Sequence, residues 1–232
     1  MSPREIVFRV YRFRPGQPEA ARYDETSFAV QESTTVLEVL ERLRGRDPSL
    51  MFRHSCHHGS CGTCACRING RERLACTTRV LELGTDLVTV EPLNKLRRDG
   101  DLVVDPADLL REYPPHLQTL RASEWLSGAQ PPEELSGYTR LENCIECGAC
   151  LSACPVNDFL GPALLAAINR ERVNRPDSAA RMLELAGSER GVGKCRRALE
   201  CSRVCPTGVY PARHIEELRK LSGKRKLPGM GR

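Results

Sequence analysis

The sequence predicts an α+β protein in which a mixed β domain precedes a mostly helical domain. Strand-like alternation is confined to about the first hundred residues, helix-like segments dominate after Asp105, and twelve cysteines gather in short runs. A chain of 232 residues is long enough for two small domains. We therefore expect one domain at residues 1–104 and a second at residues 105–232.

Alternating patterns predict the strands of the first domain. Ile6–Arg14 alternates apolar and basic residues as a half-buried strand does, and the turn-rich Pro15–Pro18 separates it from a second candidate at Thr26–Gln31. Asn69-Gly70 is a strong signal for a hairpin turn. The remaining strand candidates are Ala65–Ile68, Arg71–Ala75 and, as a closing strand, Leu87–Val90.

One helix is predicted between these strands. Thr35 and Glu38 have the spacing of a capping box, in which each side chain accepts a hydrogen bond from the other residue's backbone N–H. Gly45 is the expected end of the helix. The helix would bury one apolar face, formed by Val36, Leu37, Leu40 and Leu43.

Helices are expected in the second domain because each candidate begins near Pro, Asp or Ser, which favour helix N-termini. The candidates are Pro106–Glu112, Pro162–Val173, Ser178–Ala186 and Pro211–Leu221. Ala122–Ser136 has the composition of a surface loop, and the basic Gly223–Arg232 that of a frayed tail. The seven cysteines of this domain must supply much of its stability.

Composition indicates a globular protein that holds metal. Hydrophobic residues make up 40% and charged residues 28% of the chain, and no apolar run reaches the roughly 18 residues of a membrane span. The first residues show no secretory signal, so we expect an intracellular protein. Disulfides are rare inside cells, so twelve cysteines indicate metal ligands instead.

The first cysteine group predicts a 2Fe–2S cluster. It reads C-x4-C-x2-C followed at a distance by a fourth cysteine, which is the plant-type ferredoxin spacing. Gly59 and Gly62 allow the tight loop of positive φ that such a cluster needs. The predicted ligands are Cys56, Cys61, Cys64 and Cys76.

Other interpretations of this group fit less well. The spacing and the two glycines argue against zinc, and a Rieske centre would need a histidine where Cys64 stands. His57 and His58 either lie beside the cluster or a partner, or are solvated loop residues. Cys66 is either an alternative ligand or a small buried side chain.

The second half of the chain carries a two-cluster ferredoxin pattern with one cysteine missing. Its first run, C-x2-C-x2-C-x3-C-P, is the bacterial ferredoxin signature, in which the fourth cysteine ligates the other cluster. In the second run, Ala198 stands where the middle cysteine is expected. Cys144, Cys147, Cys150 and Cys205 are then predicted to hold a 4Fe–4S cluster. Cys154, Cys195 and Cys201 supply only three thiolates, so we expect a 3Fe–4S cluster there.

Two further classes of site are excluded. Two all-cysteine zinc sites need eight sulfurs, and this half of the chain has seven. The formal charge of +5 suggests nucleic-acid binding, but eleven thiolates with their three iron–sulfur cores add about −6, leaving the loaded protein near −1. Because aromatic residues make up only 5%, we expect no nucleic-acid partner.

This arrangement resembles the iron–sulfur subunits of succinate dehydrogenase and fumarate reductase, the respiratory complex II family. The likeness covers nearly the whole chain, and chance does not plausibly explain the order and spacing of eleven cysteines. The shared phrases are SCHHGSCGTCACRINGRERLAC from Ser55, DLVVD from Asp101, CIECGACLSACP from Cys144, FLGPALLAA from Phe159 and CRRALECSRVCPTGVYP from Cys195.

The resemblance implies a β-grasp 2Fe–2S ferredoxin domain joined to an α-helical ferredoxin domain. It implies a non-catalytic electron-transfer subunit that relays electrons between an FAD-containing flavoprotein subunit, where succinate and fumarate react, and a quinone held by hydrophobic membrane anchor subunits. Such a subunit of the respiratory chain and tricarboxylic acid cycle would lie peripherally on the cytoplasmic side of the plasma membrane. The alternative is a soluble or variant oxidoreductase, such as a thiol-dependent fumarate reductase or a glycolate-oxidase-like assembly, with a non-quinone partner.

The chain departs from the family near the expected quinone site. Many members carry a Trp pair just after the cysteine-proline that matches Cys154-Pro155, whereas the sole Trp here is Trp125. Arg196 stands where members often have a histidine. The residues expected at the edge of a quinone or anchor site are therefore Pro155, Arg196 and Ala198.

Overall fold

The computed structural model describes residues 3–105, 107–110 and 143–222. The chain divides into two compact units, one formed by Met1–Leu109 with Ile145–Ala153 and the other by Leu110–Cys144 with Cys154–Arg232. They are called unit 1 and unit 2. The predicted loop Ala122–Ser136 with Trp125, and the tail Gly223–Arg232, lie outside the described residues. The predicted domain boundary at residues 104 and 105 stays a prediction.

Unit 1 is built on a mixed five-stranded sheet with the order β2-β1-β5-β3-β4. β1 runs antiparallel to β2 and parallel to β5, and β3 runs antiparallel to both β5 and β4. The strands are β1 (Arg4–Arg14), β2 (Gln17–Val30), β3 (Ala65–Ile68), β4 (Arg71–Leu74) and β5 (Leu87–Glu91).

Two strands differ from the sequence-based expectation. β2 starts nine residues before the predicted Thr26, since its polar first half pairs with β1 as far as Arg12↔Arg22 and, after a shift of register, again at Arg14↔Gln17. β5, expected as a closing strand, lies in the middle of the sheet between β1 and β3. Val88 and Val90 of β5 are fully buried, as a central strand requires.

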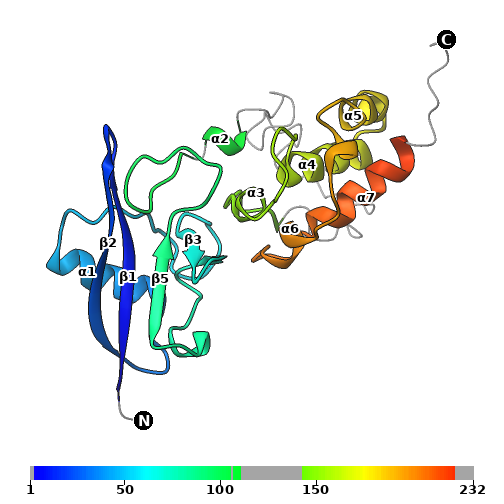
Figure 1. Ribbon diagram of the computed structural model, residues 1–232. Coiled ribbons are helices and arrows are strands. Elements are labelled where there is room, and N and C mark those ends of the chain that lie inside the picture. The colour runs from blue at the N-terminus through cyan, green and yellow to red at the C-terminus, as the bar shows by residue number, and fades with distance from the viewer. Residues whose placement is uncertain (1–2, 106, 111–142, 223–232) are drawn as a thin grey trace, which may run out of the picture. The chain divides into compact units, whose positions relative to one another are not determined.

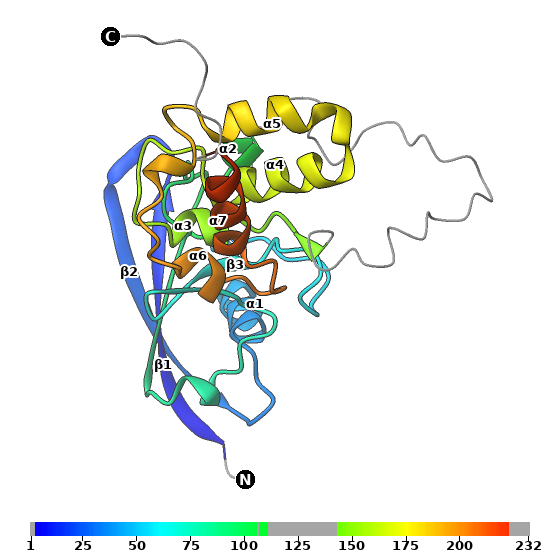
Figure 2. The same cartoon turned by 90° about the vertical axis from the view of Figure 1, so that its right-hand side faces the viewer.

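The helix α1 (Val36–Arg46) lies on one face of this sheet, which Figure 2 shows nearly edge-on. The predicted capping box is present: Glu38 N donates to Thr35 Oγ1 at 3.2 Å, and Thr35 N donates to Glu38 Oε2 at 2.7 Å. The prediction that the helix ends at Gly45 is wrong by about one residue. The Asp47 N–H still reaches the Leu43 carbonyl, so the last turn continues past the glycine. 

The predicted hairpin joins β3 to β4. Asn69 and Gly70 have φ values of 49° and 76°, the pair of positive angles that a type I′ turn requires. Two short helical turns complete this part of the chain, η1 (Leu81–Leu83) and α2 (Ala107–Leu110). α2 is the described part of the helix predicted at Pro106–Glu112; Pro106, Arg111 and Glu112 lie outside the described residues.

The segment Ile145–Ala153, which contains α3 (Ala149–Ser152), belongs to unit 1 although it is distant in sequence. The Ser152 hydroxyl donates to Glu72 Oε1 of β4 at 2.7 Å and accepts from the backbone N–H of Asn94 at 2.8 Å. Ser152 and Glu72 are both buried. This anchor brings a stretch that includes Cys147 and Cys150 into the N-terminal unit.

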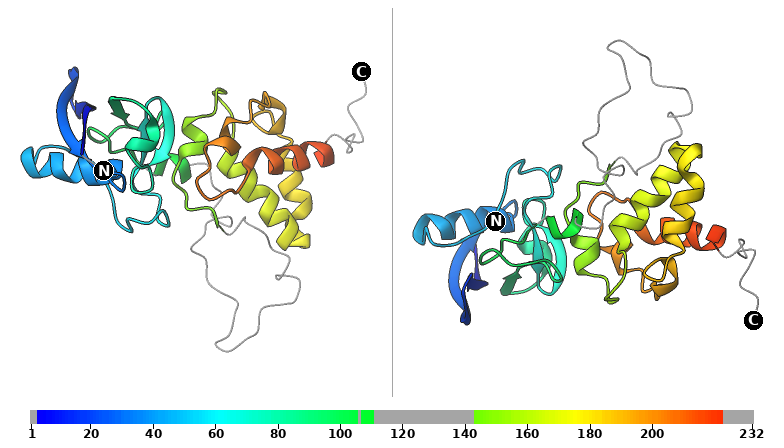
Figure 3. Two further views of the ribbon diagram at one scale, coloured as in Figure 1. Left: turned by 90° about the horizontal axis from the view of Figure 1, so that it is seen from below. Right: turned by 90° about the horizontal axis from the view of Figure 1, so that it is seen from above.

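Unit 2 is helical in its described residues. α4 contacts both α5 and α7, and the three helices stay together in the views of Figures 1 and 3. Their bounds agree with the predicted helices to within one residue. The elements are α4 (Pro162–Asn174), η5 (Pro176–Ser178), α5 (Ala179–Ala186), η6 (Val192–Lys194), α6 (Glu200–Arg203) and α7 (Pro211–Ser222). The core between them includes Leu165, Ile168, Met182, Ile215 and Leu218.

Within the described ranges, none of the helices has both the length and the apolar character needed to cross a bilayer.

Candidate metal centres

The loop at residues 54–64, called the 2Fe–2S loop, folds around the sulfur of Cys56. The backbone N–H groups of Ser60 and Cys61 donate to Cys56 Sγ at 3.3 and 3.4 Å. Hydrogen bonds from Ser60, His58 and Cys61 lower the pKa of the Cys56 thiol to about 5. A sulfur that receives several N–H donors is prepared to be a thiolate ligand.

Cys76 reaches the same place from the end of the β3–β4 hairpin. Burial raises the pKa of the Cys76 thiol to about 12, with further contributions from the neighbouring Cys64 and Cys56. Cys61 in turn interacts with Cys56. The fold therefore gathers the four cysteines that the spacing predicts, and a metal centre that binds them would displace their protons.

Glycine conformation makes this loop turn tightly. Gly59 and Gly62 have φ values of 84° and 73°, in the left-handed region that glycine adopts without steric cost. This confirms the backbone role predicted for both residues.

Cys66 lies in the core of unit 1. It is 3% exposed, in β3 opposite Arg73, and burial raises the pKa of its thiol far above the usual range. Its placement corresponds to the alternative of a small buried side chain.

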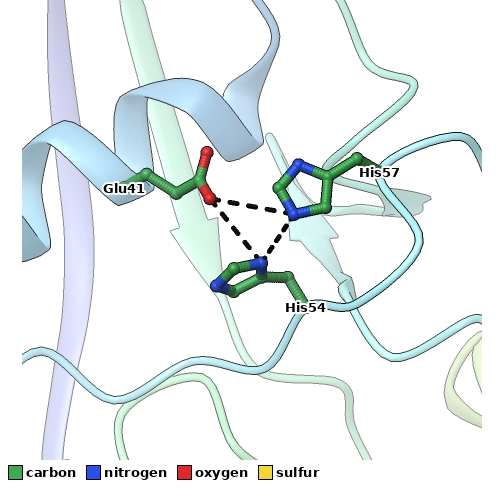
Figure 4. A group of neighbouring side chains, drawn as sticks. All are labelled: Glu41, His54 and His57. Carbon is green, nitrogen blue, oxygen red and sulfur yellow. Dashed lines mark hydrogen bonds and ion pairs between the residues drawn. The ribbon is translucent and has the colours of Figure 1, made fainter.

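Glu41 of α1 lies close to two histidines of the 2Fe–2S loop, His54 and His57 (Figure 4). His54 Nδ1 lies 2.9 Å from His57 Nε2 and 3.6 Å from Glu41 Oε1, and His57 Nε2 lies 3.8 Å from the same oxygen. His57 was singled out in the sequence, whereas Glu41 and His54 were not. Only the fold brings α1 to this loop.

Arg44 decides how this cluster is protonated. Its Nη2 lies 2.8 Å from His54 Nε2, and a guanidinium can only donate, so His54 Nε2 acts as the acceptor. A neutral His54 then carries its proton on Nδ1 and donates it to His57. A metal ion at His54 Nδ1 would need that proton removed and Arg44 displaced, so the cluster is better described as a hydrogen-bonded chain that fixes His57 next to Cys56.

In unit 2, the predicted three-ligand set lines a single cavity of about 250 Å³, called the three-cysteine cavity. Cys154, Cys195 and Cys201 all contribute to its wall, and so does Ala198. Burial raises the pKa of the Cys201 thiol to about 11, followed by the effect of the nearby Cys154. Pro155 and Arg196 line the same cavity.

The backbone around Ala198 is strained. Arg197 and Leu199 have φ values of 56° and 65°, which are uncommon for residues with a side chain. The Arg197 N–H donates to Cys195 Sγ at 3.5 Å, and Arg219 Nη2 donates to the Cys195 carbonyl at 2.9 Å. Such strain concentrates at functional sites, where the surrounding structure maintains it.

The four cysteines predicted to hold a 4Fe–4S cluster are divided between the units. Cys147 and Cys150 belong to unit 1, whereas Cys144 and Cys205 belong to unit 2. Cys205 Sγ accepts from the Val209 N–H at 3.3 Å. Their assignment to one cluster stays a prediction from the spacing.

Two family comparisons match the two parts of the chain. Residues 7–111 match the 2Fe-2S iron-sulfur cluster binding domain family, and residues 140–209 match the 4Fe-4S dicluster domain family. The chain is also similar to the solved structure of a Mycobacterium smegmatis Sdh1 complex in the apo form. The TM-score is 0.75 at 24% identity, over 97% of this chain and 98% of that one, which supports the fold. The chain thus has an N-terminal 2Fe–2S ferredoxin domain and a C-terminal helical ferredoxin-like region.

Curated relatives extend over almost the whole sequence. The fumarate reductase iron-sulfur subunit of Mycobacterium tuberculosis is 34% identical over 228 residues, covering 91% of this chain and 90% of the relative. The succinate dehydrogenase iron-sulfur subunit of Coxiella burnetii is 31% identical, covering 92% and 95%. A mitochondrial succinate dehydrogenase subunit of Oryza sativa is 31% identical, covering 93% and 81%. The chain therefore belongs to the family of succinate dehydrogenase and fumarate reductase iron–sulfur subunits, as its cysteine pattern predicts.

Proposed function

We propose that this chain relays single electrons, without performing the reaction at carbon, between an FAD-containing flavoprotein subunit and a quinone held by a hydrophobic membrane anchor. It would bind the anchor peripherally, on the cytoplasmic side of the plasma membrane. The observation that carries the proposal is the grouping of eleven cysteines into a four-, a four- and a three-ligand set within this family. The relatives' names favour this function over a soluble or variant oxidoreductase with a non-quinone partner.

The first centre is a 2Fe–2S cluster on Cys56, Cys61, Cys64 and Cys76. When bound, such a cluster accepts and releases one electron. The chain directs backbone N–H groups at Cys56 Sγ, and it buries the side chains of Cys64 and Cys76. Hydrogen bonds to sulfur and burial are the means by which a protein sets a cluster's potential.

The second centre is a 4Fe–4S cluster on Cys144, Cys147, Cys150 and Cys205. Its support is the sequence spacing together with the match to the 4Fe-4S dicluster family. In the bacterial ferredoxin arrangement, the last cysteine of each run crosses to the other cluster. Cys205 takes that position in the second run.

The third centre is a 3Fe–4S cluster on Cys154, Cys195 and Cys201. These three thiols line one cavity, and the side chain between them in sequence, Ala198, ends in a methyl group that cannot bind iron. Pro155, Arg196 and Ala198 line this cavity as well, which supports their proposed place at the edge of a quinone or anchor site.

Replacing Ala198 by Cys tests the three-ligand set. The complex would be purified from membranes with its native partners, and both oxidised and reduced forms examined by EPR. We expect the wild-type protein to show an oxidised-state 3Fe–4S signal, and Ala198→Cys to lose it in favour of a reduced-state 4Fe–4S signal. A variant that keeps the 3Fe–4S signal at full intensity would contradict the assignment.

The same purification tests the partners. We expect a flavoprotein with bound FAD and a hydrophobic anchor protein to accompany the chain in equal amounts. Isolation of an active complex without any anchor would favour the alternative partner.

The matched control for Ala198→Cys is Ala186→Cys, which adds a thiol at a buried position of α5 away from the lining of the three-cysteine cavity. We expect Ala186→Cys to keep the oxidised-state 3Fe–4S signal.

A further inference from the structure

Gly62 lies where two cysteine-bearing segments of unit 1 touch. It stands between Cys61 and Cys64 in the 2Fe–2S loop. A Cβ atom added at Gly62 would lie 2.8 Å from Cys147 Cβ and 2.8 Å from the Ile145 carbonyl oxygen. Both distances are shorter than any ordinary carbon contact, so the loop and the segment at residues 145–153 are in direct contact here, with no room for a side chain.

The segment at residues 145–153 is held against unit 1 by further contacts. Ser152 is anchored to Glu72 and Asn94, as described above. At Gly148, an added Cβ would lie 3.1 Å from Leu96 Cδ1 and 3.4 Å from Leu93 Cδ1. The segment is therefore packed closely on both sides of Cys147, and it has little freedom to move away from Gly62.

We propose that Gly62 is a positioning residue that sets the closest approach between the 2Fe–2S loop and the loop that carries Cys147. This inference rests on the proposed function, in which Cys147 is a ligand of the second centre. Electron transfer between metal centres slows steeply as their separation grows. The absence of a side chain at residue 62 therefore keeps the two ligand loops at the shortest separation that the backbone permits.

Gly62→Ala and Gly59→Ala form a matched pair for testing this role. Both glycines lie in the same loop with similar positive φ, 73° and 84°, so both alanine variants carry the same kind of backbone strain. An added Cβ at Gly59 meets the flexible Thr77 methyl group at 3.1 Å, and none of its close contacts lies in the segment at residues 145–153. Only Gly62→Ala pushes on Cys147.

The first readout is hydrogen exchange in the cluster-loaded protein. The amides of Leu151 and Ser152 bond the Gly148 carbonyl in α3 and report on how well the segment is held. We expect about tenfold faster exchange of these amides in Gly62→Ala, and less than about twofold in Gly59→Ala. Equal exchange in the two variants would overturn the proposal.

The second readout is EPR of the reduced protein. A nearby paramagnetic centre speeds the spin relaxation of the 2Fe–2S signal, and this effect weakens with distance. We expect the effect to weaken in Gly62→Ala and to persist in Gly59→Ala. A relaxation effect unchanged in Gly62→Ala would also overturn the proposal.

Ser152→Ala covers the case in which Gly62→Ala does not load its 2Fe–2S cluster. It removes the anchor to Glu72 without strain in the 2Fe–2S loop, and we expect it to give the same faster exchange and weaker relaxation effect. If Ser152→Ala changes neither, the packing of this segment does not set the approach. A wild-type protein that lacks a 4Fe–4S signal altogether would instead count against the proposed function, and the exchange comparison would still test the contact at Gly62.

Discussion

The 2Fe–2S loop and the three-cysteine cavity provide for metal in different ways. In the loop, positive φ falls on Gly59, Gly62 and one residue with a side chain, His57, and backbone N–H groups turn toward Cys56 Sγ. In the three-cysteine cavity, positive φ falls on Arg197 and Leu199, which flank Ala198, the residue that stands in place of a fourth cysteine ligand. The comparison teaches that the loop places two of its three positive φ angles on glycine, whereas the cavity places both of its own on residues with a side chain, a backbone conformation that the surroundings must maintain.

The largest expected effect comes from removing a thiol in unit 1. Cys64→Ala should abolish the 2Fe–2S cluster, because a three-thiolate loop no longer completes the ligand set. Visible circular dichroism and iron and sulfide analysis of the purified complex would measure the loss.

Cys66→Ala is the matched control, since Cys66 is also a buried cysteine and lies two residues away on β3. It should keep the cluster and lower the free energy of unfolding by only about 1 kcal/mol, the scale for loss of a small buried group. If Cys66→Ala also lost the cluster, Cys66 would be a ligand and the predicted set would be wrong.

The next largest effect concerns the buried carboxylate of Asp101 in unit 1. Asp101 is fully buried and accepts hydrogen bonds from the backbone N–H groups of Phe13 and Met51 at 2.7 and 2.8 Å. Its carboxylate also pairs with Arg12 and Arg14 at 3.3 and 2.8 Å. Arg12 keeps its ion pairs with Asp24 and Asp47 at 2.9 and 2.6 Å, but Asp101→Asn would turn one buried acceptor into a donor that faces other donors, so we expect a loss of about 1–3 kcal/mol in the free energy of unfolding.

Urea unfolding followed by 2Fe–2S absorbance would measure this loss. Asp86→Asn is the control, because Asp86 pairs with Arg4 at 2.6 Å on the surface, with side chains 75% and 50% exposed. An exposed pair contributes only about 0–1 kcal/mol. A similar loss in both variants would mean that the charge of Asp101 does not hold this unit together.

Relief of the backbone strain beside Ala198 should change the free energy of unfolding by less, and should raise it. Leu199 has a φ of 65° and a side chain that is 48% exposed, so Leu199→Gly should relieve strain while sacrificing little buried area. We expect it to stabilise the cluster-loaded protein by about 1 kcal/mol. Leu199→Ala keeps the strain and should not stabilise. Thermal unfolding of the two variants compares them directly, and a gain in Leu199→Ala equal to that in Leu199→Gly would rule out backbone strain as the cause.

The sequence predicts these features unevenly, for physical reasons. The capping box at Thr35 and the Asn69-Gly70 turn are local, so they could be predicted and they agree with the structure. Cysteine spacing is local as well, and the ligand sets drawn from it stay predictions. The length of β2 could not, because pairing with β1 overrides the polar character of its first half. The cluster of Glu41 with two histidines and the contact of Gly62 with Cys147 depend on tertiary packing between segments distant in sequence. No local pattern marks such contacts.

The smallest effect is a pH dependence that His214 of α7 contributes in unit 2. Burial lowers the pKa of His214, whose Nδ1 lies 2.9 Å from the Asn169 amide nitrogen, a donor that requires this ring nitrogen to be unprotonated. In the unfolded chain His214 binds a proton near pH 6.5, whereas in the folded chain it does so only at lower pH. The contribution of His214 to the free energy of unfolding is therefore constant above about pH 6.5 and declines as the pH falls below it. His214→Gln should flatten the dependence of the unfolding temperature on pH between about 5 and 7. His58→Gln, on the 2Fe–2S loop of unit 1, is the comparison variant, and an equal flattening in both variants would not assign the dependence to His214. A slope unchanged in His214→Gln would assign the pH dependence to another group and remove this difference between the units.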